Sequence, residues 1–300
     1  MNGLLLVNKP PAHTSFDVIA RLRGATGIRR IGHTGTLDPL ATGVLPVLFG
    51  RCAKFADLLP DTDKRYTAGI RLGVTTDTLD ITGKVLSRRA SRVTKTELEA
   101  ALRPFRGEIE QLPPMYSAVK IAGVRLYEMA RRGETVERAP RTVVIKELEL
   151  LSFDEAAGDF SIDVRCSKGA YIRSLCADIG DALGCGAVLT SLVRTEACGF
   201  ALARCTALED CLQNGPERYL LPPDAALTAY APLFLTAGQT ARFQNGVKLP
   251  FSLLSLPDRC TKYLRVYDPE GRFIGLAQPD CCERLLRVKV LFLCGDGKPE

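Results

Sequence analysis

The chain has 300 residues and a formal net charge of +6 at pH 7, with 46% hydrophobic and 25% charged residues. This balance is that of a globular protein with a sizeable core, and it excludes a disordered or collagen-like chain. No apolar run reaches the roughly 18 residues that a membrane-spanning helix needs, and the apolar part of the N-terminus is too short for a signal peptide. The mild basicity suits a polyanionic partner without requiring one.

Eleven cysteines are many for this length, but their spacing forms no metal or disulfide framework. No Cys-x-x-Cys pair occurs, and only two histidines, His13 and His33, are available as further ligands. Structural zinc sites draw on closely spaced Cys and His side chains. We therefore expect no metal site, mostly buried reduced thiols and a cytoplasmic location.

The first segments predict strands and a helix. Gly3 to Val7 is apolar throughout, as in a buried strand. Thr14 or Ser15 then suits the N-cap of a short helix that ends at Gly24. Further on, Val44 to Phe49 predicts a second strand, and its Pro46 indicates an edge or a bulge.

Between that helix and the second strand lies the segment GHTGTLDPLATGVLPV, from Gly32 to Val47. Its glycines allow backbone angles that other residues resist, and its prolines fix φ. Many such residues close together are typical of a loop with a fixed shape. The residue that this loop presents is Asp38. A second interpretation is a helix start, because Asp is a good N-cap and Pro a good first helical residue. A phosphate-binding loop is disfavoured, since Gly-x4-Gly-Lys-Ser/Thr is absent.

The same segment resembles the active-site loop of the TruB family of tRNA pseudouridine-55 synthases, with the pattern G-H-T-G-x-L-D-P-x-A-x-G-x-L-P. Thr36 stands where other members often carry Ala or Gly. The resemblance implies that Asp38 is the catalytic nucleophile and that uridine 55, in the T-loop of tRNA, is flipped out and isomerised. This isomerisation involves no redox change, so no cofactor is expected. The implied partner is the T-arm of tRNA, with no protein partner required and a monomeric enzyme.

The next segments predict a strand and two helices. Lys64 to Leu72 alternates polar and apolar residues, with Tyr66 on the apolar face. Taken alone, Tyr66 is a half-buried core aromatic. Thr94 to Glu97 is a capping box that opens a helix. Arg125 to Arg132 predicts another helix, which in the resembling family belongs to a lobe that clamps RNA.

The segment from Pro113 to Lys120 contains Ser-x-x-Lys, at Ser117 and Lys120. This is the nucleophile signature of penicillin-binding enzymes. We reject that interpretation because the accompanying Lys-Thr-Gly and Ser-Asp-Asn elements are missing. The same segment occurs in the resembling family.

The remaining part of the first 200 residues predicts a hairpin, a helix and a strand. The hairpin joins Thr142–Phe153 to Phe160–Cys166, the helix runs to Leu183, and Val188 to Phe200 forms the strand. Many strands follow directly on others, which favours the α+β class with a mainly antiparallel mixed sheet flanked by helices. The resemblance implies the pseudouridine synthase fold.

The composition shifts at Leu221-Pro222-Pro223, and beyond Tyr230 the predicted strands are short and separated by turns such as Asp268 to Gly271. We therefore expect a catalytic domain at 1–228 and a small β-barrel-like module at 229–300. This module resembles the PUA domain, which binds RNA behind many pseudouridine synthases.

The resemblance assigns further roles. Arg173 is implied to keep Asp38 ionised and to aim it, and Tyr66 to pack against the target base and assist proton removal from C5. The residues implied to line the uridine pocket or to lie near the flipped nucleotides are Tyr171, Leu192 and His33. For any single cation a solvated surface charge is the commoner explanation, and the candidates for phosphate contacts are Lys9, Lys64, Arg65, Lys120, Arg125, Arg131, Arg132 and Lys168.

Two alternatives remain open at this point. One is the guide-dependent relative that forms the catalytic subunit of a ribonucleoprotein, which would normally carry a basic tail. The other is a non-catalytic RNA-binding protein in which Asp38 only caps a helix. The presence of Tyr66 and Arg173 together with Asp38 favours an enzyme over the second alternative.

Overall fold

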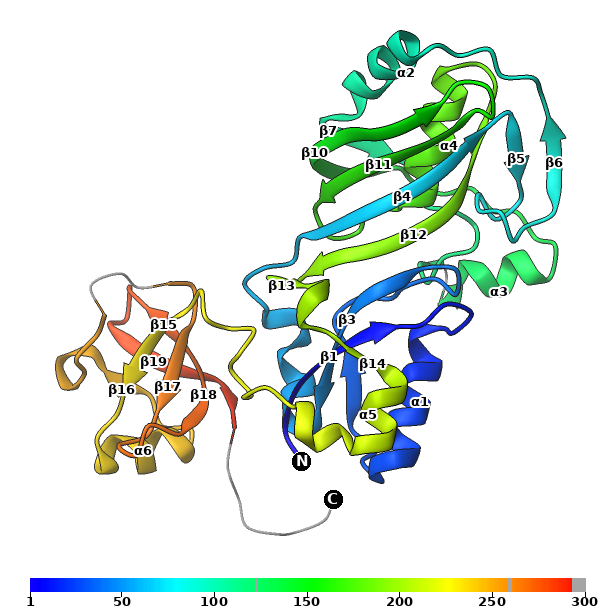
Figure 1. The fold of residues 1–300 in the computed structure, drawn as a ribbon. Coiled ribbons are helices and arrows are strands. Elements are labelled where there is room, and N and C mark those ends of the chain that lie inside the picture. Colours follow the sequence, from blue (N-terminus) through cyan, green and yellow to red (C-terminus); the bar gives the residue numbers. More distant parts are fainter. Residues whose placement is uncertain (122, 258–260, 293–300) are drawn as a thin grey trace.

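The computed structural model describes residues 1–121, 123–257 and 261–292, and two sheets organise them (Figure 1). The larger sheet runs in the order β14-β1-β3-β12-β4-β11-β10-β7, with β2 also paired to β3 and β13 to β12. Its parallel pairs within the described chain are β1–β14 and β3–β12, and the other pairs are antiparallel. The expected α+β class with a mainly antiparallel mixed sheet is therefore confirmed. The strands are β1 (Gly3–Lys9), β2 (Ile31–His33), β3 (Thr42–Phe49), β4 (Lys64–Leu72), β7 (Gly107–Gln111), β10 (Arg141–Asp154), β11 (Asp159–Cys166), β12 (Ala187–Ala197), β13 (Phe200–Ala201) and β14 (Thr206–Ala207).

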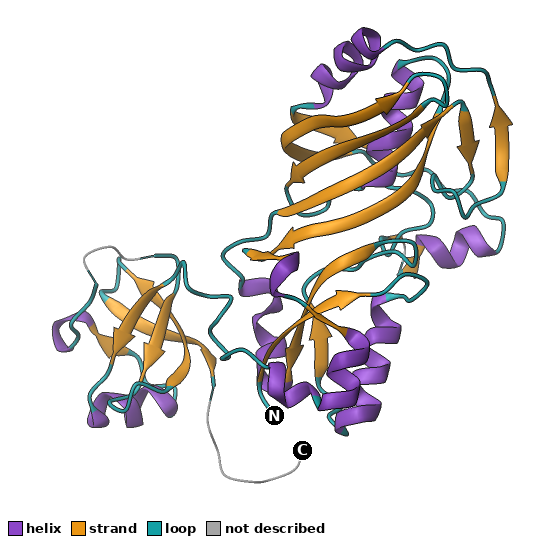
Figure 2. Cartoon of the chain, in the orientation of Figure 1, coloured by secondary structure: helices purple, strands orange, loops and turns teal. Residues whose placement is uncertain are grey.

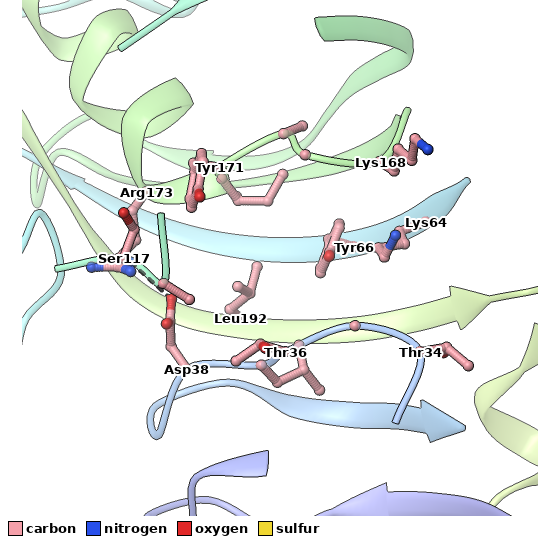
Figure 3. A pocket seen from close by; sticks show the side chains of 16 residues that line it. Thr34, Thr36, Asp38, Lys64, Tyr66, Ser117, Lys168, Tyr171, Arg173 and Leu192 are labelled. Carbon is pink, nitrogen blue, oxygen red and sulfur yellow. Dashed lines mark ion pairs between the residues drawn. The ribbon is translucent and has the colours of Figure 1, made fainter. Parts of the chain in front are cut away.

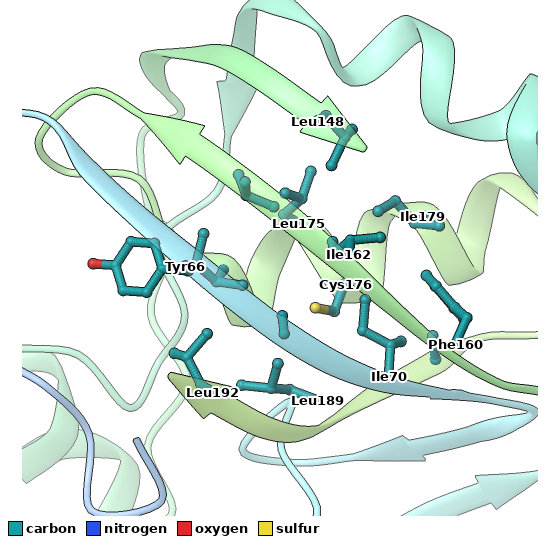
Figure 4. Close-up of a cluster of buried hydrophobic side chains, with 14 of the residues drawn as sticks. Tyr66, Ile70, Leu148, Phe160, Ile162, Leu175, Cys176, Ile179, Leu189 and Leu192 are labelled. Carbon is teal, nitrogen blue, oxygen red and sulfur yellow. The ribbon is translucent and has the colours of Figure 1, made fainter. Parts of the chain in front are cut away.

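Helices cover the larger sheet in two groups (Figure 2). Helices α1 (Ser15–Thr26) and α5 (Leu208–Asn214) pack on β1 and β3 around Leu5, Val47 and other buried side chains. Helices α4 (Ile172–Ala182) and α2 (Lys95–Leu102) pack on β4, β10, β11 and β12 (Figure 4). The shorter elements are the hairpin of β5 (Val74–Thr76) and β6 (Val85–Arg88), the hairpin of β8 (Lys120–Ile121) and β9 (Val124–Arg125), and α3 (Leu126–Arg131).

The alternation predicted for Lys64 to Leu72 is confirmed in β4. Tyr66, Ala68, Ile70 and Leu72 are all at most 6% exposed and belong to the same hydrophobic cluster as α4. Their neighbours in sequence point to the opposite face, as the twofold period of a strand requires. The phenol of Tyr66 thus starts from the helix-covered face of the sheet.

Helix α1 begins as predicted and ends later than predicted. Thr14 accepts from the N–H of Asp17 while the Asp17 carboxylate accepts from Thr14, which completes a capping box. The helix continues through Gly24 and stops at Gly27, whose φ of 69° is left-handed and whose N–H donates to Arg23 O. The predicted end at Gly24 is wrong because the left-handed residue that terminates a helix lies one turn further on.

The larger sheet is nearly divided where β3 meets β12. Only two residue pairs join these strands in the described structure, Val193 with Thr42 and Arg194 with Gly43. A Cβ on Gly43 would lie 2.3 Å from Arg194 O, and its φ of 100° is left-handed, so both space and conformation require glycine. The loop that carries Asp38 leads directly into this junction.

Pro46 does not place β3 at an edge. Its strand lies between β1 and β12, with Pro46 opposite Leu6, so the predicted edge position is wrong. On its other side β12 pairs with residues 42–43 and β2 with residues 47–49, which leaves a gap between them. Pro46 O accepts from Thr34 N in that gap. The missing N–H of Pro46 points the same way and removes no ladder bond.

The predicted strand Val188 to Phe200 is interrupted near its end. Strand β12 ends at Ala197, and a tight turn through Cys198 (φ 54°) and Gly199 (φ 75°) leads into β13. Ala197 then pairs with Phe200. A hydrophobic run cannot by itself indicate such a turn, because Cys198 is an unusual residue for the left-handed region.

The C-terminal sheet runs in the order β15-β17-β18-β19-β16 and has its own hydrophobic cluster around Phe243 and Leu264. It is curled, as a half-barrel, and α6 (Ala237–Gln244) lies against it. The division of the chain at residue 228 stays a prediction, because a further cluster joins residues from both sides of it. The strands are β15 (Ala231–Phe234), β16 (Leu249–Pro250), β17 (Leu264–Tyr267), β18 (Phe273–Asp280) and β19 (Leu285–Leu291).

That shared cluster is centred on Phe55, from the 3₁₀ segment Gly50–Leu58. Phe55 is 1% exposed, and its ring lies 5.8 Å from Phe273 and 6.0 Å from Phe292. Nearby, the Tyr230 hydroxyl donates to Leu58 O at 2.9 Å. The C-terminal sheet is therefore held against the larger sheet by apolar packing.

Phe55→Ala should destabilise the protein by about 3–5 kcal/mol, since it empties a buried aromatic site shared by the two sheets. The measurement is the free energy of unfolding from denaturant titration. Phe234→Ala is the matched control, because Phe234 is 62% exposed although its ring stacks on Tyr267. Equal losses in the two variants would contradict the proposed importance of the Phe55 contact.

Candidate active site

A cavity of about 350 Å³ opens where the Asp38 loop, β4 and β12 come together (Figure 3). The 117–118 segment and residues 168–173, which lead into α4, complete its wall. Segments far apart in the sequence thus contribute to one site. The predicted site residues that line it are Asp38, Lys64, Tyr66, Lys168, Tyr171, Arg173 and Leu192.

Asp38 lies in an irregular loop, and no helix begins there. The helix-cap interpretation of Asp38 is therefore wrong. Ser15, at the start of α1, fixes the loop on one side: its hydroxyl accepts from Leu37 N at 2.8 Å and donates to Leu37 O at 3.2 Å. On the other side Ala12 N donates to Pro39 O at 2.9 Å. The carboxylate is presented from a backbone held immediately before and after it.

Lys9 is a part of this support. Its side chain is fully buried, and Nζ donates to Pro10 O at 2.8 Å, to His13 O at 2.6 Å and to Pro39 O at 3.5 Å. Burial lowers the pKa of Lys9 to about 8, while the nearby Asp38 carboxylate acts in the opposite direction. Backbone carbonyls thus enclose the ammonium group, so the structure gives the predicted phosphate contact of Lys9 no support.

The Arg173 guanidinium is the centre of the site. Its Nε lies 2.8 Å from Asp38 Oδ2, Nη1 donates to Thr78 O at 2.9 Å, and Nη2 donates to Tyr116 O at 2.8 Å. The side chain is 5% exposed, whereas that of Asp38 is 38% exposed at the cavity. Arg173 therefore joins three loops with one planar group.

Burial and charge act on Asp38 in opposite directions. Burial raises the pKa of the Asp38 carboxyl, Arg173 lowers it, and the Asp80 carboxylate raises it further, with a net upward shift. Asp80 is 6% exposed and lies 4.0 Å from Arg173 Nη1. The Arg173 ion pair therefore limits a shift that burial would otherwise make larger.

Tyr66 and Arg194 form a second buried pair. They lie opposite each other in the β4–β12 ladder, and Arg194 is fully buried. Its Nε donates to Val44 O at 2.7 Å and its Nη2 to Gly35 O at 3.0 Å, so it holds the Asp38 loop onto β3. Burial raises the pKa of Tyr66, and the Arg194 charge opposes that shift.

The remaining walls are partly apolar. Leu192 of β12 is 7% exposed, and Tyr171 immediately precedes α4. Gln111 fixes Tyr171: its Oε1 accepts from Tyr171 N at 2.9 Å and its Nε2 donates to Tyr171 O at 3.3 Å. Lys64 and Lys168 contribute cations to the same cavity (Figure 3).

Other predicted residues lie outside the cavity. His33 is on β2, where its buried Nδ1 has no hydrogen-bond partner within the described ranges. Arg65 faces away from Tyr66 and pairs with Asp163 at 2.7 Å. Four exposed cations lie in or next to α3: Lys120, Arg125, Arg131 and Arg132.

Sequence reasoning missed three contributors: Asp80, Ser117 and Arg194. Asp80 ends the polar segment Thr76 to Asp80, and nothing in the sequence pattern separates it from Asp77. Arg194 breaks the apolar alternation of a central strand, which is a usable signal for a buried cation with a special role.

Within residues 1–121, 123–257 and 261–292, no cluster of three or more His, Cys, Asp or Glu side chains could hold a metal ion. In the same ranges, no helix has the length and apolar character needed to cross a membrane.

Family models match most of the larger sheet and its helices. Residues 23–172 match the N-terminal domain of the TruB family of pseudouridylate synthases, and residues 173–228 match the C-terminal domain of tRNA pseudouridylate synthase B. The first match ends and the second begins at the Tyr171–Arg173 segment that reaches the cavity.

Relatives with curated names agree with the family models. A tRNA pseudouridine synthase B from Clostridium tetani is 42% identical over 279 residues, which cover 93% of this chain and 96% of the relative. The protein of the same name from Chromobacterium violaceum is 43% identical over 297 residues, 97% of this chain and 95% of the relative.

Among solved structures, a chain of a Cbf5–Nop10–Gar1 complex superposes with a TM-score of 0.73 at 24% identity, covering 97% of this chain and 85% of that one. A chain of an H/ACA ribonucleoprotein bound to substrate RNA gives a TM-score of 0.73 at 21% identity, covering 98% and 86%. At these identities the similarity shows the fold, and it extends through the C-terminal sheet.

The carboxyl carbon of Asp38 should titrate above the ordinary range for Asp in an NMR pH titration, and Arg173→Lys should change that pKa less than Arg173→Met, which should raise it further. Because the folded state binds this proton more tightly than the unfolded state, the contribution of Asp38 to stability is present at low pH and is lost as the pH rises through its folded-state pKa.

Asp159 is the internal control for this titration. Its carboxylate also binds an arginine, with two contacts of 2.7 Å to Arg71, but it is at the surface, and Arg71 lowers the pKa of Asp159. A pKa of Asp38 at or below that of Asp159 would show that burial does not dominate at the site.

Proposed function

Since the chain belongs to the TruB family of pseudouridylate synthases and is a tRNA pseudouridine synthase, we propose that its target is uridine 55 in the T-loop and that Asp38 is the catalytic nucleophile. The observation that carries this proposal is the Arg173–Asp38 ion pair of 2.8 Å, which lies at a cavity walled by Tyr66, Tyr171 and Leu192.

The reaction requires the N1–C1′ bond of uridine to break and a C1′–C5 bond to form. The proton on C5 leaves and N1 gains a proton, so that atoms and electrons balance without an oxidant, a reductant or another co-reactant. An ionised carboxylate suits a step that resembles glycosidic cleavage, because it holds the detached fragment transiently. Arg173 favours the ionised form and fixes which Asp38 oxygen remains free to react.

A uridine inside a folded loop reaches this cavity only after it leaves its stack. Tyr66, Tyr171 and Leu192 then offset part of the unstacking cost through apolar contact with the base. Burial raises the pKa of Tyr66 above that of an ordinary tyrosine, which is itself protonated near neutral pH. We propose that Tyr66 packs against the target base and assists removal of the C5 proton.

Phosphate contacts are proposed for the cations around the cavity and on α3. Lys64 and Lys168 lie at the cavity itself. On α3, the Arg131 guanidinium lies 5.5 Å from the centre of the Tyr127 ring, and that of Arg125 lies 5.8 Å from it. Both arginines are exposed, Arg125 at the end of β9 and Arg131 at the end of α3, and both guanidinium groups are therefore available to phosphates.

We further propose that the C-terminal sheet is a PUA-like RNA-binding module and that the enzyme acts as a monomer in a reducing cytoplasm. The nine cysteines in the described ranges are free. The guide-dependent alternative is less well supported, because the relatives at 42–43% identity are named tRNA pseudouridine synthase B.

Asp38→Asn should abolish pseudouridine formation in unmodified tRNA while folding and tRNA affinity persist, because the amide keeps the size of the side chain but removes the charge that reacts. Pseudouridine mapping, thermal unfolding and tRNA affinity should be measured on one preparation. Asp159→Asn, which breaks an exposed Asp–Arg pair on β11, should retain turnover. Near-normal turnover in Asp38→Asn would exclude the nucleophile assignment.

Binding of a T-arm hairpin should weaken as salt rises, and Lys64→Gln and Lys168→Gln should each reduce the slope of log K against log salt by roughly 0.7–0.9, since each lysine releases counterions at one phosphate. Lys146→Gln is the control, because the Lys146 ammonium is already paired with Asp63 at 2.6 Å. An unchanged slope in both lysine variants would remove these residues from the RNA interface.

A further inference from the structure

Ser117 lines the same cavity as Asp38 and Arg173, beside their ion pair (Figure 3). It is 6% exposed, and its backbone is fixed on both sides: Ser117 N donates to Met115 O at 2.9 Å, and Ser117 O accepts from Tyr127 N at 3.1 Å. The buried hydroxyl, in contrast, has no hydrogen-bond partner among the described residues.

Other serines buried to the same degree have partners. The Ser15 hydroxyl bonds the backbone of Leu37, and the Ser174 hydroxyl donates to Leu112 O at 3.0 Å. Buried hydroxyl groups are nearly always hydrogen-bonded, because an unpaired one has lost its contact with water without compensation. Ser117 therefore departs from the rule at the cavity, next to the reacting carboxylate.

The surroundings of Ser117 do not suit a nucleophile. Lys120, the second residue of the Ser-x-x-Lys pattern, is exposed on β8 and does not line the cavity. The Asp38 carboxylate is already bound by Arg173. The carbonyl oxygen of Tyr116, the residue before Ser117, accepts from the same guanidinium. With no base directed at it in the described structure, the hydroxyl is suited to binding and not to attack.

We propose that the Ser117 hydroxyl hydrogen-bonds a polar atom of the flipped target nucleotide, and so helps to hold that nucleotide at the cavity. The inference rests on the proposed function and adds a substrate-binding residue to it. A hydroxyl both donates and accepts, so its partner is a uracil carbonyl or the ribose 2′-hydroxyl. Rotation about the single Cα–Cβ bond directs the hydroxyl from its buried position toward the cavity.

This role predicts that Ser117→Ala lowers activity without lowering thermal stability. The kcat/KM for a T-arm hairpin should fall about tenfold, because the contact with substrate is lost. The thermal midpoint should stay the same or rise, because the variant removes an unpaired buried hydroxyl. Ser174→Ala is the matched control: it removes a satisfied hydroxyl from the same region, so its thermal midpoint should fall.

The nucleotide atom is identified from dissociation constants of hairpins that carry 2′-deoxyuridine, 2-thiouridine or 4-thiouridine at the target. If Ser117 binds the altered atom, that analogue weakens binding to the wild type but costs Ser117→Ala nothing further. Unchanged kcat/KM in Ser117→Ala, or equal analogue penalties in both proteins for all three hairpins, would overturn the proposal. Failure of the wild type to form pseudouridine would instead refute the proposed function.

Discussion

The site depends on one planar cation. Arg173 is nearly enclosed, and each edge of its guanidinium binds a different loop: the one that carries Asp38, the one after β5, and the one before β8. A lysine offers a point charge and cannot make three such directed contacts from one plane. The loops that Arg173 holds together thus set the orientation of the Asp38 carboxylate. The balance between burial of this carboxylate and its ion pair with Arg173 sets its pKa.

The sheet supplies the place for this arrangement. The two halves of the larger sheet share a short parallel junction between β3 and β12, and Arg194 and Gly43 fill it. The Asp38 loop leads into the junction from one half, while Tyr66 and Leu192 reach it from the other. The cavity therefore lies where β3 and β12 separate. Arg194 fixes the Asp38 loop at this point through its bonds to Gly35 O and Val44 O.

Sequence patterns predicted the periodic parts of this structure well. The alternation in β4, the N-cap of α1 and the capping box of α2 are local, and each survives in the fold. The errors at Gly24, Pro46 and Cys198 arise where a neighbouring segment decides the outcome. Lys9 and Ser117 show the same limit in the site. The sequence did not indicate that either residue is buried beside Asp38, because burial and hydrogen-bond partners depend on contacts between segments that are far apart in the chain.

The three loops on Arg173 also constrain how the protein folds. The contact with Thr78 spans 95 residues of sequence and that with Tyr116 spans 57. Forming such long-range contacts costs loop-closure entropy and slows folding. The carboxylate acquires its orientation only once Arg173 has met it together with Thr78 and Tyr116, so a growing chain that ends before Arg173 leaves Asp38 without its ion pair.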